Sequence, residues 1–281
     1  MRLERFFTKL FCRPVLIEAS TRIAFEMTLL SMMDGARPAD AVAASFQMRK
    51  TDPEKSQRRA DGILEMRGQT ALIHIDGSID KNLSALDLMC MDATDLADVD
   101  RALATCENNA SIRNVMLVIN SPGGSVTGVP ETGARIAALA ETKNVFAYTE
   151  GMCCSAAYWL AAQCDQIFCT GSAQVGSIGV YLALVEQSEA LKARGLKVTT
   201  VKEGSLKAAG AAWKPLTKDE EAHFQDQVTQ IGEAFRDAVT AKRPDVAEET
   251  MQGQSFFGER NLKLGLVDAI VRDLDEALVQ F

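Results

Sequence analysis

The sequence predicts a mixed α/β fold in which helices flank a mostly parallel sheet. From residue 70 onward, short apolar runs alternate with segments of helical spacing, which is the pattern of parallel strands joined by crossover helices. The run VMLVI at 115–119 is apolar at every position, as in a strand covered on both faces. Hydrophobic residues make up 47% and charged residues 24% of 281 residues, which fits a soluble globular protein.

Five strands and five helices follow from this alternation. We expect strands at 70–76, 115–119, 145–149, 166–170 and 197–201, and helices at 87–106, 128–140, 155–162, 188–194 and 217–242. The last helix has the clearest signals: Thr217 and Glu220 form a capping box, and Pro244 lies just beyond its end. Its apolar stripe consists of Phe224, Val228, Ile231, Phe235 and Val239.

The first 60 residues differ from the rest in charge. They hold 11 Lys or Arg and 7 Asp or Glu, a balance of +4. Because the whole chain has a net charge of −8, the remaining 221 residues carry −12. Residues 18–33 have helical character and residues 49–61 form a polar linker. We therefore expect an N-terminal helical arm and linker at 1–60, serving docking or partner binding, and one domain at 61–281.

Composition excludes several classes of site. Seven cysteines without CxxC spacing and only two histidines provide no zinc cluster, so we expect reduced thiols and neither metal nor cofactor. A net charge of −8 argues against a nucleic-acid groove. The longest apolar stretch, 152–164, has 13 residues against the roughly 20 that a membrane helix needs, so we expect no membrane anchor and a cytoplasmic location.

Two loops that follow predicted strands suit acyl-transfer chemistry. In the loop at 120–125, NSPGGS, two glycines allow the backbone N–H groups to point at an oxyanion, although a plain tight turn also explains them. In the second loop Gly151 makes the turn and Ser155 stands at a helix start, where the helix dipole favours an alkoxide. The alternative for Ser155 is a hydroxyl that only caps the helix.

A third loop, at 201–210, supplies a lysine that could act as a base. Lys207 stands among small residues, and in a dry pocket its pKa would fall towards neutrality; the alternative is a solvated surface lysine. His74 lies inside a predicted strand and His223 in the first turn of the long helix. The base for a serine nucleophile is therefore expected to be lysine rather than histidine.

These loops together resemble a known family. The succession INSPGGS (119–125), GMCCSAAYWLA (151–161), QVGSIGV (174–180) and EGSLKAAGAAWKPLTKDE (203–220) is similar to the signal peptide peptidase A family of Ser/Lys serine peptidases. FCRPVLIEA (11–19) and FFGERNLKLGLVDAI (256–270) resemble its branch of phage head-maturation proteases. The resemblance implies a ClpP/crotonase-like fold.

The resemblance also assigns roles. It implies that Ser155 is the nucleophile, Lys207 the general base, Gly124 and Ala156 the oxyanion-hole donors, and Ser177 the residue that orients the lysine amine. Family members more often have small residues where Cys153 and Cys154 stand, which suggests sensitivity to oxidation or thiol reagents.

The implied function is a serine endopeptidase that cleaves capsid and scaffold proteins in an immature phage head. Its implied assembly is a homo-oligomeric ring whose Ser/Lys dyad is shared between subunits. Four alternatives stay open: a cytosolic peptidase that degrades signal peptides, an acyl-CoA enzyme of the crotonase type with Glu150 as the nearby carboxylate, a Ser/His/Asp compartment protease, and a non-catalytic scaffold of the same fold.

Overall fold

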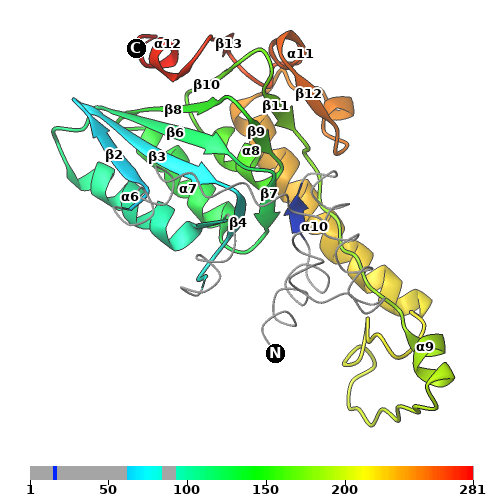
Figure 1. The fold of residues 1–281 in the computed structure, drawn as a ribbon. Coiled ribbons are helices and arrows are strands. Elements are labelled where there is room, and N and C mark those ends of the chain that lie inside the picture. The colour runs from blue at the N-terminus through cyan, green and yellow to red at the C-terminus, as the bar shows by residue number, and fades with distance from the viewer. Residues whose placement is uncertain (1–14, 18–61, 84–92, 281) are drawn as a thin grey trace. The chain divides into compact units, whose positions relative to one another are not determined.

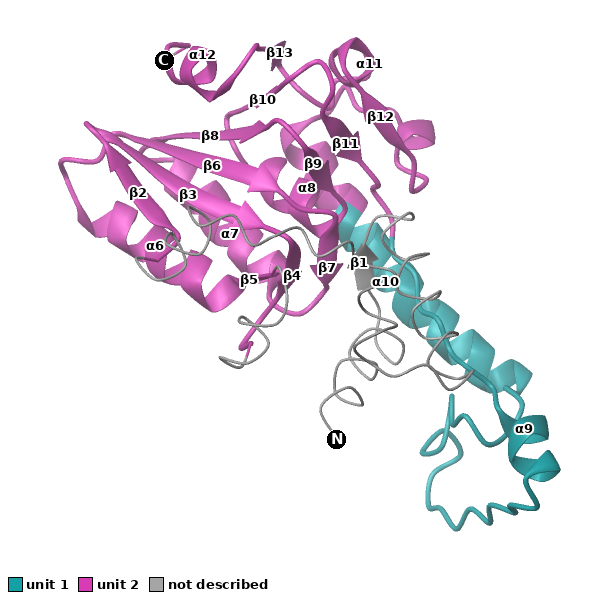
Figure 2. Ribbon diagram, viewed as in Figure 1, with its two compact units in different colours: residues 1–15, 180–235 teal, residues 16–179, 236–281 magenta. Residues whose placement is uncertain are grey.

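The computed structural model describes residues 15–17, 62–83 and 93–280 (Figure 1). The chain forms two compact units: unit 1 comprises residues 1–15 and 180–235, and unit 2 comprises residues 16–179 and 236–281 (Figure 2). The predicted helix at 18–33 and the linker at 49–61 lie outside the described residues. The domain boundary at 60/61 therefore stays a prediction.

A six-stranded sheet forms the centre of unit 2, in the order β13-β10-β8-β6-β3-β2. All neighbouring pairs are parallel except β2 with β3, so the predicted α/β class with a mostly parallel sheet is confirmed. The strands are β2 (Leu64–Arg67), β3 (Thr70–Asp76), β6 (Asn114–Asn120), β8 (Asn144–Thr149), β10 (Gln166–Cys169) and β13 (Ala269–Ile270).

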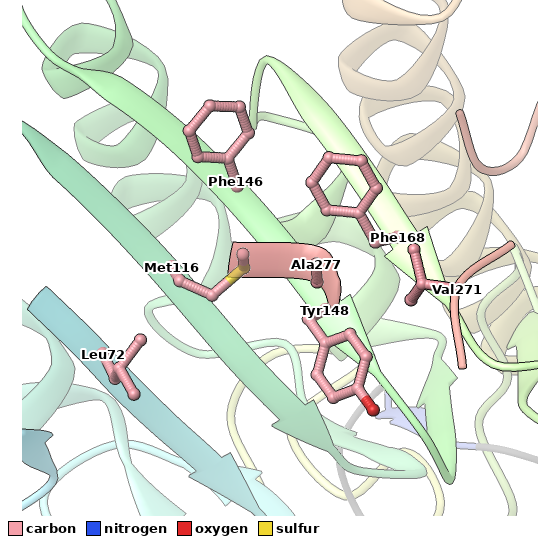
Figure 3. Packing of buried hydrophobic residues seen from close by; sticks show 7 residues of the cluster. All are labelled: Leu72, Met116, Phe146, Tyr148, Phe168, Val271 and Ala277. Carbon is pink, nitrogen blue, oxygen red and sulfur yellow. The ribbon is translucent and has the colours of Figure 1, made fainter. Parts of the chain in front are cut away.

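Both faces of this sheet are covered. Helices α6 (Leu96–Asn108) and α7 (Val129–Ala140) lie along one face, and the C-terminal helix α12 (Leu274–Leu278) lies on the other (Figure 1). On the α12 side, buried side chains from four neighbouring strands meet Ala277 (Figure 3). They are Leu72, Met116, Phe146, Tyr148 and Phe168, with Val271 beside them. Each large apolar side chain buried here contributes about 1.5–3 kcal/mol.

Two small sheets adjoin the ends of the central strands. One has the order β1-β7-β4-β5, with β1 at Val15–Ile17, β4 at Ser78–Asp80, β5 at Ala93–Asp95 and β7 at Gly123–Ser125. The other has the order β12-β11-β9, with β9 at Met152–Cys154, β11 at Gln174–Gly176 and β12 at Ser255–Phe257. Two of the three loops chosen from the sequence, at 120–125 and 151–155, contribute strands to these two sheets, and the third, at 201–210, does not.

The helix predicted at 87–106 begins later than expected. Residues 93–95 form β5 and the helix observed is α6, because Asp95 ends the strand and caps the helix by accepting the Ala97 N–H at 2.9 Å. The Asp95 carboxylate also accepts the backbone N–H groups of Asn82 (2.9 Å) and Leu83 (2.7 Å), which fixes it at this boundary. The part of the prediction at 87–92 falls among undescribed residues.

Unit 1 contains α9 (Ser188–Ala193) and the first part of α10 (Lys218–Lys242), whose C-terminal end belongs to unit 2. The predicted capping box is confirmed: the Glu220 N–H donates to Thr217 Oγ1 at 3.3 Å, and the Thr217 N–H donates to Glu220 Oε2 at 3.1 Å. The strand predicted at 197–201 is wrong. Residues 194–217 form neither helix nor strand, so no neighbouring strand pairs with the β-branched run at 198–201, and Val201 is 96% exposed.

The remaining elements complete unit 2. Helix α8 (Ala156–Ala161) follows β9, a short 3-10 helix covers Glu248–Thr250, and α11 (Glu259–Lys263) follows β12. The predicted apolar stripe of α10 is buried at Phe235 and Val239. None of the described helices is both long and apolar enough to span a bilayer.

Candidate active site

Ser155 stands at the junction where β9 ends and α8 begins. Its backbone has φ 56° and ψ −117°, a left-handed conformation that costs a non-glycine residue about 1–3 kcal/mol. Two hydrogen bonds hold it there: its N–H donates to Gly176 O at 2.8 Å, and its carbonyl accepts the Trp159 N–H at 2.9 Å. The surrounding backbone thus fixes the position of the Ser155 main chain, from which the side chain projects.

The Ser155 hydroxyl is buried without a hydrogen-bond partner among the described residues. The residue is 1% exposed, and its Oγ makes no capping bond to α8. The alternative that this hydroxyl only caps the helix is therefore wrong. A buried hydroxyl left unpaired costs about 1–3 kcal/mol, so a strained serine with a free Oγ is a candidate for a chemical role.

Ser177 lies beside Ser155 because their strands are in register. In the parallel pair β9–β11, the last residues, Cys154 and Gly176, pair with each other. Each serine is the residue that directly follows its strand. Ser177 also has a positive φ, 53°, and its N–H donates to Gln254 O at 2.6 Å. It is buried, like Ser155. Two neighbouring parallel strands thus end in two buried serines with left-handed backbones.

The loop at 120–125 is fastened to the strand that leads to Ser155. The Ser121 N–H donates to Met152 O at 2.7 Å, and the Cys154 N–H donates to Ser121 O at 3.1 Å. The Asn120 side chain adds a third bond, because its Oδ1 accepts the Met152 N–H at 3.2 Å. Within the loop, Ser121 Oγ accepts the Gly123 N–H at 3.1 Å. These bonds hold the glycine loop and β9 as one rigid group.

Two glycines of this group leave no room for a side chain. A Cβ on Gly124 would lie 1.9 Å from the backbone oxygen of Ile79, the residue that Gly124 pairs with in β4. A Cβ on Gly151 would lie 2.3 Å from Asn120 Oδ1. The sequence predicted these glycines because the backbone bends there. The structure adds a second reason, because neighbouring atoms lie too close for a Cβ.

Ala156, the second predicted oxyanion donor, is the first residue of α8 and is fully buried. N–H groups at a helix start have no acceptor inside their own helix, so they are available to an outside acceptor. Gly124 and Ala156 lie on the two segments that the bonds of Ser121 join. Their joint action on one oxyanion stays a prediction.

The comparison with family models decides the classification. A model described as peptidase family S49 matches residues 137–280, slightly more than half of the chain. The chain belongs to peptidase family S49. The matched region includes Ser155, Ser177 and Lys207, and the resemblance found in the sequence motifs is thereby confirmed at the level of the family.

Curated relatives of this S49 member come from archaea, phages and plants. A protein of Methanocaldococcus jannaschii named as a protease is 34% identical over 172 residues, covering 60% of this chain and 55% of the relative. Capsid assembly protease C of Escherichia phage lambda is 23% identical over 279 residues (96% and 63%). The chloroplastic serine protease SPPA of Arabidopsis thaliana is 27% identical over 215 residues (74% and 31%). The chain spans about a third to two thirds of these relatives' lengths.

Lys207 lies in unit 1, whose position relative to unit 2 is not determined. It is exposed in a turn in which its N–H donates to Gly204 O at 3.2 Å. The dry pocket expected around Lys207 is not formed by the residues of unit 1. The pairing of Ser155 with Lys207 therefore stays a prediction.

Both histidines of this S49 member have partners of their own. His74 Nε2 on β3 is 3.2 Å from Glu65 Oε2 on the neighbouring strand β2. His223 Nε2 on α10 is 3.3 Å from the side-chain nitrogen of Gln227. Neither bonds to the Ser155 hydroxyl, which has no partner in the described part of the chain. This pattern weighs against a Ser/His/Asp triad.

The cysteines next to Ser155 are buried thiols. Cys153 and Cys154 are at most 1% exposed, and none of the five described cysteines forms a disulfide. Desolvation, followed by the neighbouring Cys154, raises the pKa of the Cys153 thiol well above its usual value. The Cys154 thiol points to Gln174 O at 3.6 Å. Neutral, inaccessible thiols react slowly, which weighs against the expected sensitivity to thiol reagents.

Three positioning residues were not predicted from the sequence. Asn120 holds the turn before Ser155 through its side chain, and Gly176 and Gln254 receive the N–H groups of the two serines through their carbonyl oxygens. Only Asn120 had a sequence signal, as a polar residue directly after a buried strand. Among the described residues, no group of three potential metal ligands comes together.

Proposed function

We propose that this chain is a serine endopeptidase in which Ser155 Oγ attacks the carbonyl carbon of a peptide bond. The observation that carries the proposal is the buried, unpartnered hydroxyl of Ser155 on a strained junction between β9 and α8. An unpaired hydroxyl that hydrogen bonds do not restrain can turn towards both a base and a substrate. Membership of peptidase family S49 supports this assignment and disfavours the acyl-CoA alternative.

The proposed reaction uses residues of this chain throughout. Neutral Lys207 takes the Ser155 hydroxyl proton while Oγ bonds to the carbonyl carbon, and the N–H groups of Gly124 and Ala156 stabilise the resulting oxyanion. The Lys207 ammonium then gives its proton to the leaving amine as the C–N bond breaks. Water, deprotonated by Lys207, hydrolyses the acyl-enzyme and restores Ser155. Ser177 holds the lysine amine in place.

A homo-oligomer would complete this site. Residues 194–217, which include Lys207, contain no fully buried side chain. They do contain six of the ten large hydrophobic side chains that are exposed in the described part of the chain: Leu196, Val198, Val201, Leu206, Trp213 and Leu216. Exposed apolar residues concentrated in one segment in this way are more frequent at protein interfaces than on free surfaces. We therefore propose that a second copy covers this segment and that Lys207 of one copy serves Ser155 of its neighbour in a ring.

The proposed substrates are phage capsid and scaffold proteins, cleaved in the bacterial host cytoplasm within an immature head. Support comes from the phage lambda capsid assembly protease, whose similarity extends over 96% of this chain and thus includes the N-terminal arm. Similarity to a protein of Enterococcus faecium that is named as a signal peptide peptidase covers 60% of this chain and supports the alternative, a peptidase that degrades signal peptides. The chemistry is the same in both cases, and only the substrate differs.

The test is cleavage of both substrate classes by matched variants. The protein is co-expressed with the capsid and scaffold proteins of its own genome, or given a synthetic signal peptide, and products are read by intact mass. Wild type should cleave. Ser155→Ala should lose at least about 10⁴-fold in rate and Lys207→Ala a comparable amount. The controls Ser172→Ala and Lys263→Ala, at two exposed residues outside the segment 194–217, should stay active. Cleavage by Ser155→Ala would refute the nucleophile.

Mixing the two inactive variants tests the shared dyad. If Lys207 acts on the neighbouring copy, co-assembled Ser155→Ala and Lys207→Ala subunits form some sites with both residues intact, and activity returns to a sizeable fraction of wild type. If each copy uses its own lysine, every site lacks one residue and the mixture stays inactive. The second result would overturn the proposed assembly but would not contradict the assignment of Ser155 as the nucleophile.

A further inference from the structure

Helix α8, which begins directly after Ser155, is too short to hold itself in place. It has six residues, all of them buried, and isolated helices shorter than about 12–15 residues are marginal in water. The direction of α8 therefore depends on contacts with other parts of the chain. That direction matters for the site, because the Ser155 carbonyl accepts the Trp159 N–H in the first turn and because Ala156, a proposed oxyanion donor, is the first residue of the helix.

One side chain of α8 bonds it to the turn at 266–268, between α11 and β13. The Tyr158 hydroxyl is buried and donates to Leu266 O at 3.0 Å. Burial raises the pKa of Tyr158 above its usual value, and the nearby charge of Arg243 opposes this only in part. Tyr158 therefore stays protonated and remains a hydrogen-bond donor over the whole range of working pH.

The same turn is held by three further elements, all in unit 2. Asp268 Oδ2 pairs with Nη1 of Arg243, the residue after α10, at 2.7 Å, and it accepts the Ile167 N–H of β10 at 2.7 Å. The Asp268 N–H donates back to Ile167 O at 2.8 Å. The Leu266 N–H donates to the backbone oxygen of Asn261 on α11 at 3.0 Å. Tyr158 thus bonds α8 to a turn that β10, α11 and the end of α10 fix together.

Arg243 makes this arrangement costly. Its side chain is 7% exposed, yet its Nε and Nη2 have no hydrogen-bond partner in the part of the chain that the structure describes. Asn261, which bonds to the same turn, has a buried Oδ1 that is unpaired in the same sense. Buried polar atoms without partners destabilise a fold, and apolar residues in place of a buried ion pair are often equally stable. An ion pair kept at this cost points to a role in fixing geometry.

We propose that this turn is a clamp that sets the orientation of α8 and so the position of Ser155. Tyr158, Arg243 and Asp268 are its positioning residues, because they act through the helix and not on the reacting atoms. The clamp gives a role to the motif at 256–270, which the sequence connected only with the family. Its effect on rate rests on the proposed peptidase function, whereas its effect on the order of α8 does not.

Tyr158→Phe tests the clamp, because it removes one hydroxyl and keeps the packing of the ring. The matched control is Tyr148→Phe, at a second buried tyrosine, whose hydroxyl bonds to Glu150 Oε2 at 3.4 Å. On a cleavable peptide, kcat of Tyr158→Phe should fall about 5–20-fold, less than the roughly 10²–10³-fold cost of losing a donor, because Ala156 is displaced and not removed.

The kinetic pattern separates positioning from stability. At temperatures well below unfolding, KM and the shape of the pH profile should stay those of the wild type in Tyr158→Phe, because its hydroxyl neither binds substrate nor transfers a proton. Tyr148→Phe should keep the wild-type kcat. A Tyr158→Phe enzyme that only unfolds at lower temperature, with wild-type kcat, would overturn the effect on rate.

Amide hydrogen exchange tests the clamp without catalysis. Measured by mass spectrometry over residues 156–163, exchange should be at least about tenfold faster in Tyr158→Phe than in the wild type, and unchanged in Tyr148→Phe. Equal exchange in the two variants would overturn the clamp. Faster exchange in Tyr158→Phe alone would support it even if the wild type hydrolyses nothing and the proposed function fails.

Two substitutions of Arg243 test the ion pair. The pair uses one guanidinium nitrogen, so Arg243→Lys can still place a charge beside Asp268 and should keep kcat within about twofold of the wild type. Arg243→Met removes the charge and should lose at least as much kcat as Tyr158→Phe. A folded Arg243→Met enzyme with wild-type kcat would remove Arg243 from the clamp, and if this variant does not fold, the loss of kcat in Tyr158→Phe remains the deciding measurement.

Discussion

The loops around Ser155 and the segment around Lys207 differ in how far a single chain completes them. Around Ser155, hydrogen bonds join two loops, two glycines allow close contacts, and Ser155 itself is 1% exposed. Around Lys207 there is no helix or strand between residues 194 and 217, and the apolar side chains are exposed. The first region is organised by its own chain, whereas the second offers a surface for another.

This contrast separates two kinds of sensitivity. Where the backbone is already fixed, a substitution acts locally, through the geometry of the proposed oxyanion donors, and its effect should not depend on protein concentration. Where the site needs a second copy, a substitution acts through assembly, and its effect should shrink as concentration rises. The predictions below use this difference.

The largest effect is expected for Gly124→Ala. The added methyl group would overlap the Ile79 oxygen, so β7 has to move and one of the two proposed oxyanion donors moves with it. Loss of a donor lowers kcat about 10²–10³-fold. The control is Gly171→Ala, where a Cβ meets nothing within 4 Å. Peptide hydrolysis should fall in the first variant only, equally at all protein concentrations; wild-type kcat in Gly124→Ala would contradict the role of this loop.

An intermediate effect is expected for Val201→Asp in unit 1. Val201 is 96% exposed, so a charge there should not disturb folding, but it would weaken an apolar interface by about 1–3 kcal/mol, or roughly 10–100-fold in association. Activity and sedimentation should both become concentration-dependent. Val279→Asp, at another exposed valine (76%), is the control. If both variants behave alike, the segment around Lys207 is not an interface.

The smallest effect is expected at the start of α10, and it appears only as a change of protein stability with pH. The Lys214 ammonium, at 2.5 and 2.6 Å, lowers the pKa of the Glu220 carboxyl below its usual value, with a further contribution from the Thr217 N–H. A lowered folded-state pKa stabilises the protein above the unfolded value, near 4.3, and this stabilisation disappears as the pH falls through the folded value.

Glu220→Gln isolates this charge because glutamine can still complete the capping box. Thermal unfolding followed by circular dichroism should show a lower Tm for the variant at pH 7 and a gap that closes as the pH is lowered below about 4. The exposed neighbour Glu221 provides the control Glu221→Gln. A gap that persists unchanged at low pH would show that the Lys214 pair does not stabilise α10.

Hydrophobic periodicity was sufficient to predict the long helices and strands. It failed where tertiary contacts decide whether a strand forms. The parallel strands β3, β6 and β8 and helix α10 follow from buried apolar runs and a capping box, which are local signals. The apolar and β-branched run at 197–201 predicts a strand equally well, yet no neighbour pairs with it. A strand exists only if a partner accepts its hydrogen bonds, and that information is not local.

The sequence indicated candidate residues for the site, but not the backbone contacts that support them. Ser155 stands out because a glycine turn follows a strand and precedes a helix, and the family resemblance assigned its role. The three-residue strands β9 and β11 are too short to show periodicity, so their register, which places Ser177 beside Ser155, had no sequence signal. The same holds for the carbonyl groups of Gly176 and Gln254, since any residue type supplies one.

The left-handed backbone of Ser155 has a consequence for attempts to engineer this protein. Glycine adopts such a conformation without the steric penalty that serine bears, and it also removes the unpaired hydroxyl. Selection for heat resistance alone therefore favours Ser155→Gly, a change that abolishes the proposed chemistry. At this position a substitution that raises thermal stability removes the proposed activity. A durable and active variant has to gain its extra stability elsewhere, in the sheet core or on the surface of the helices.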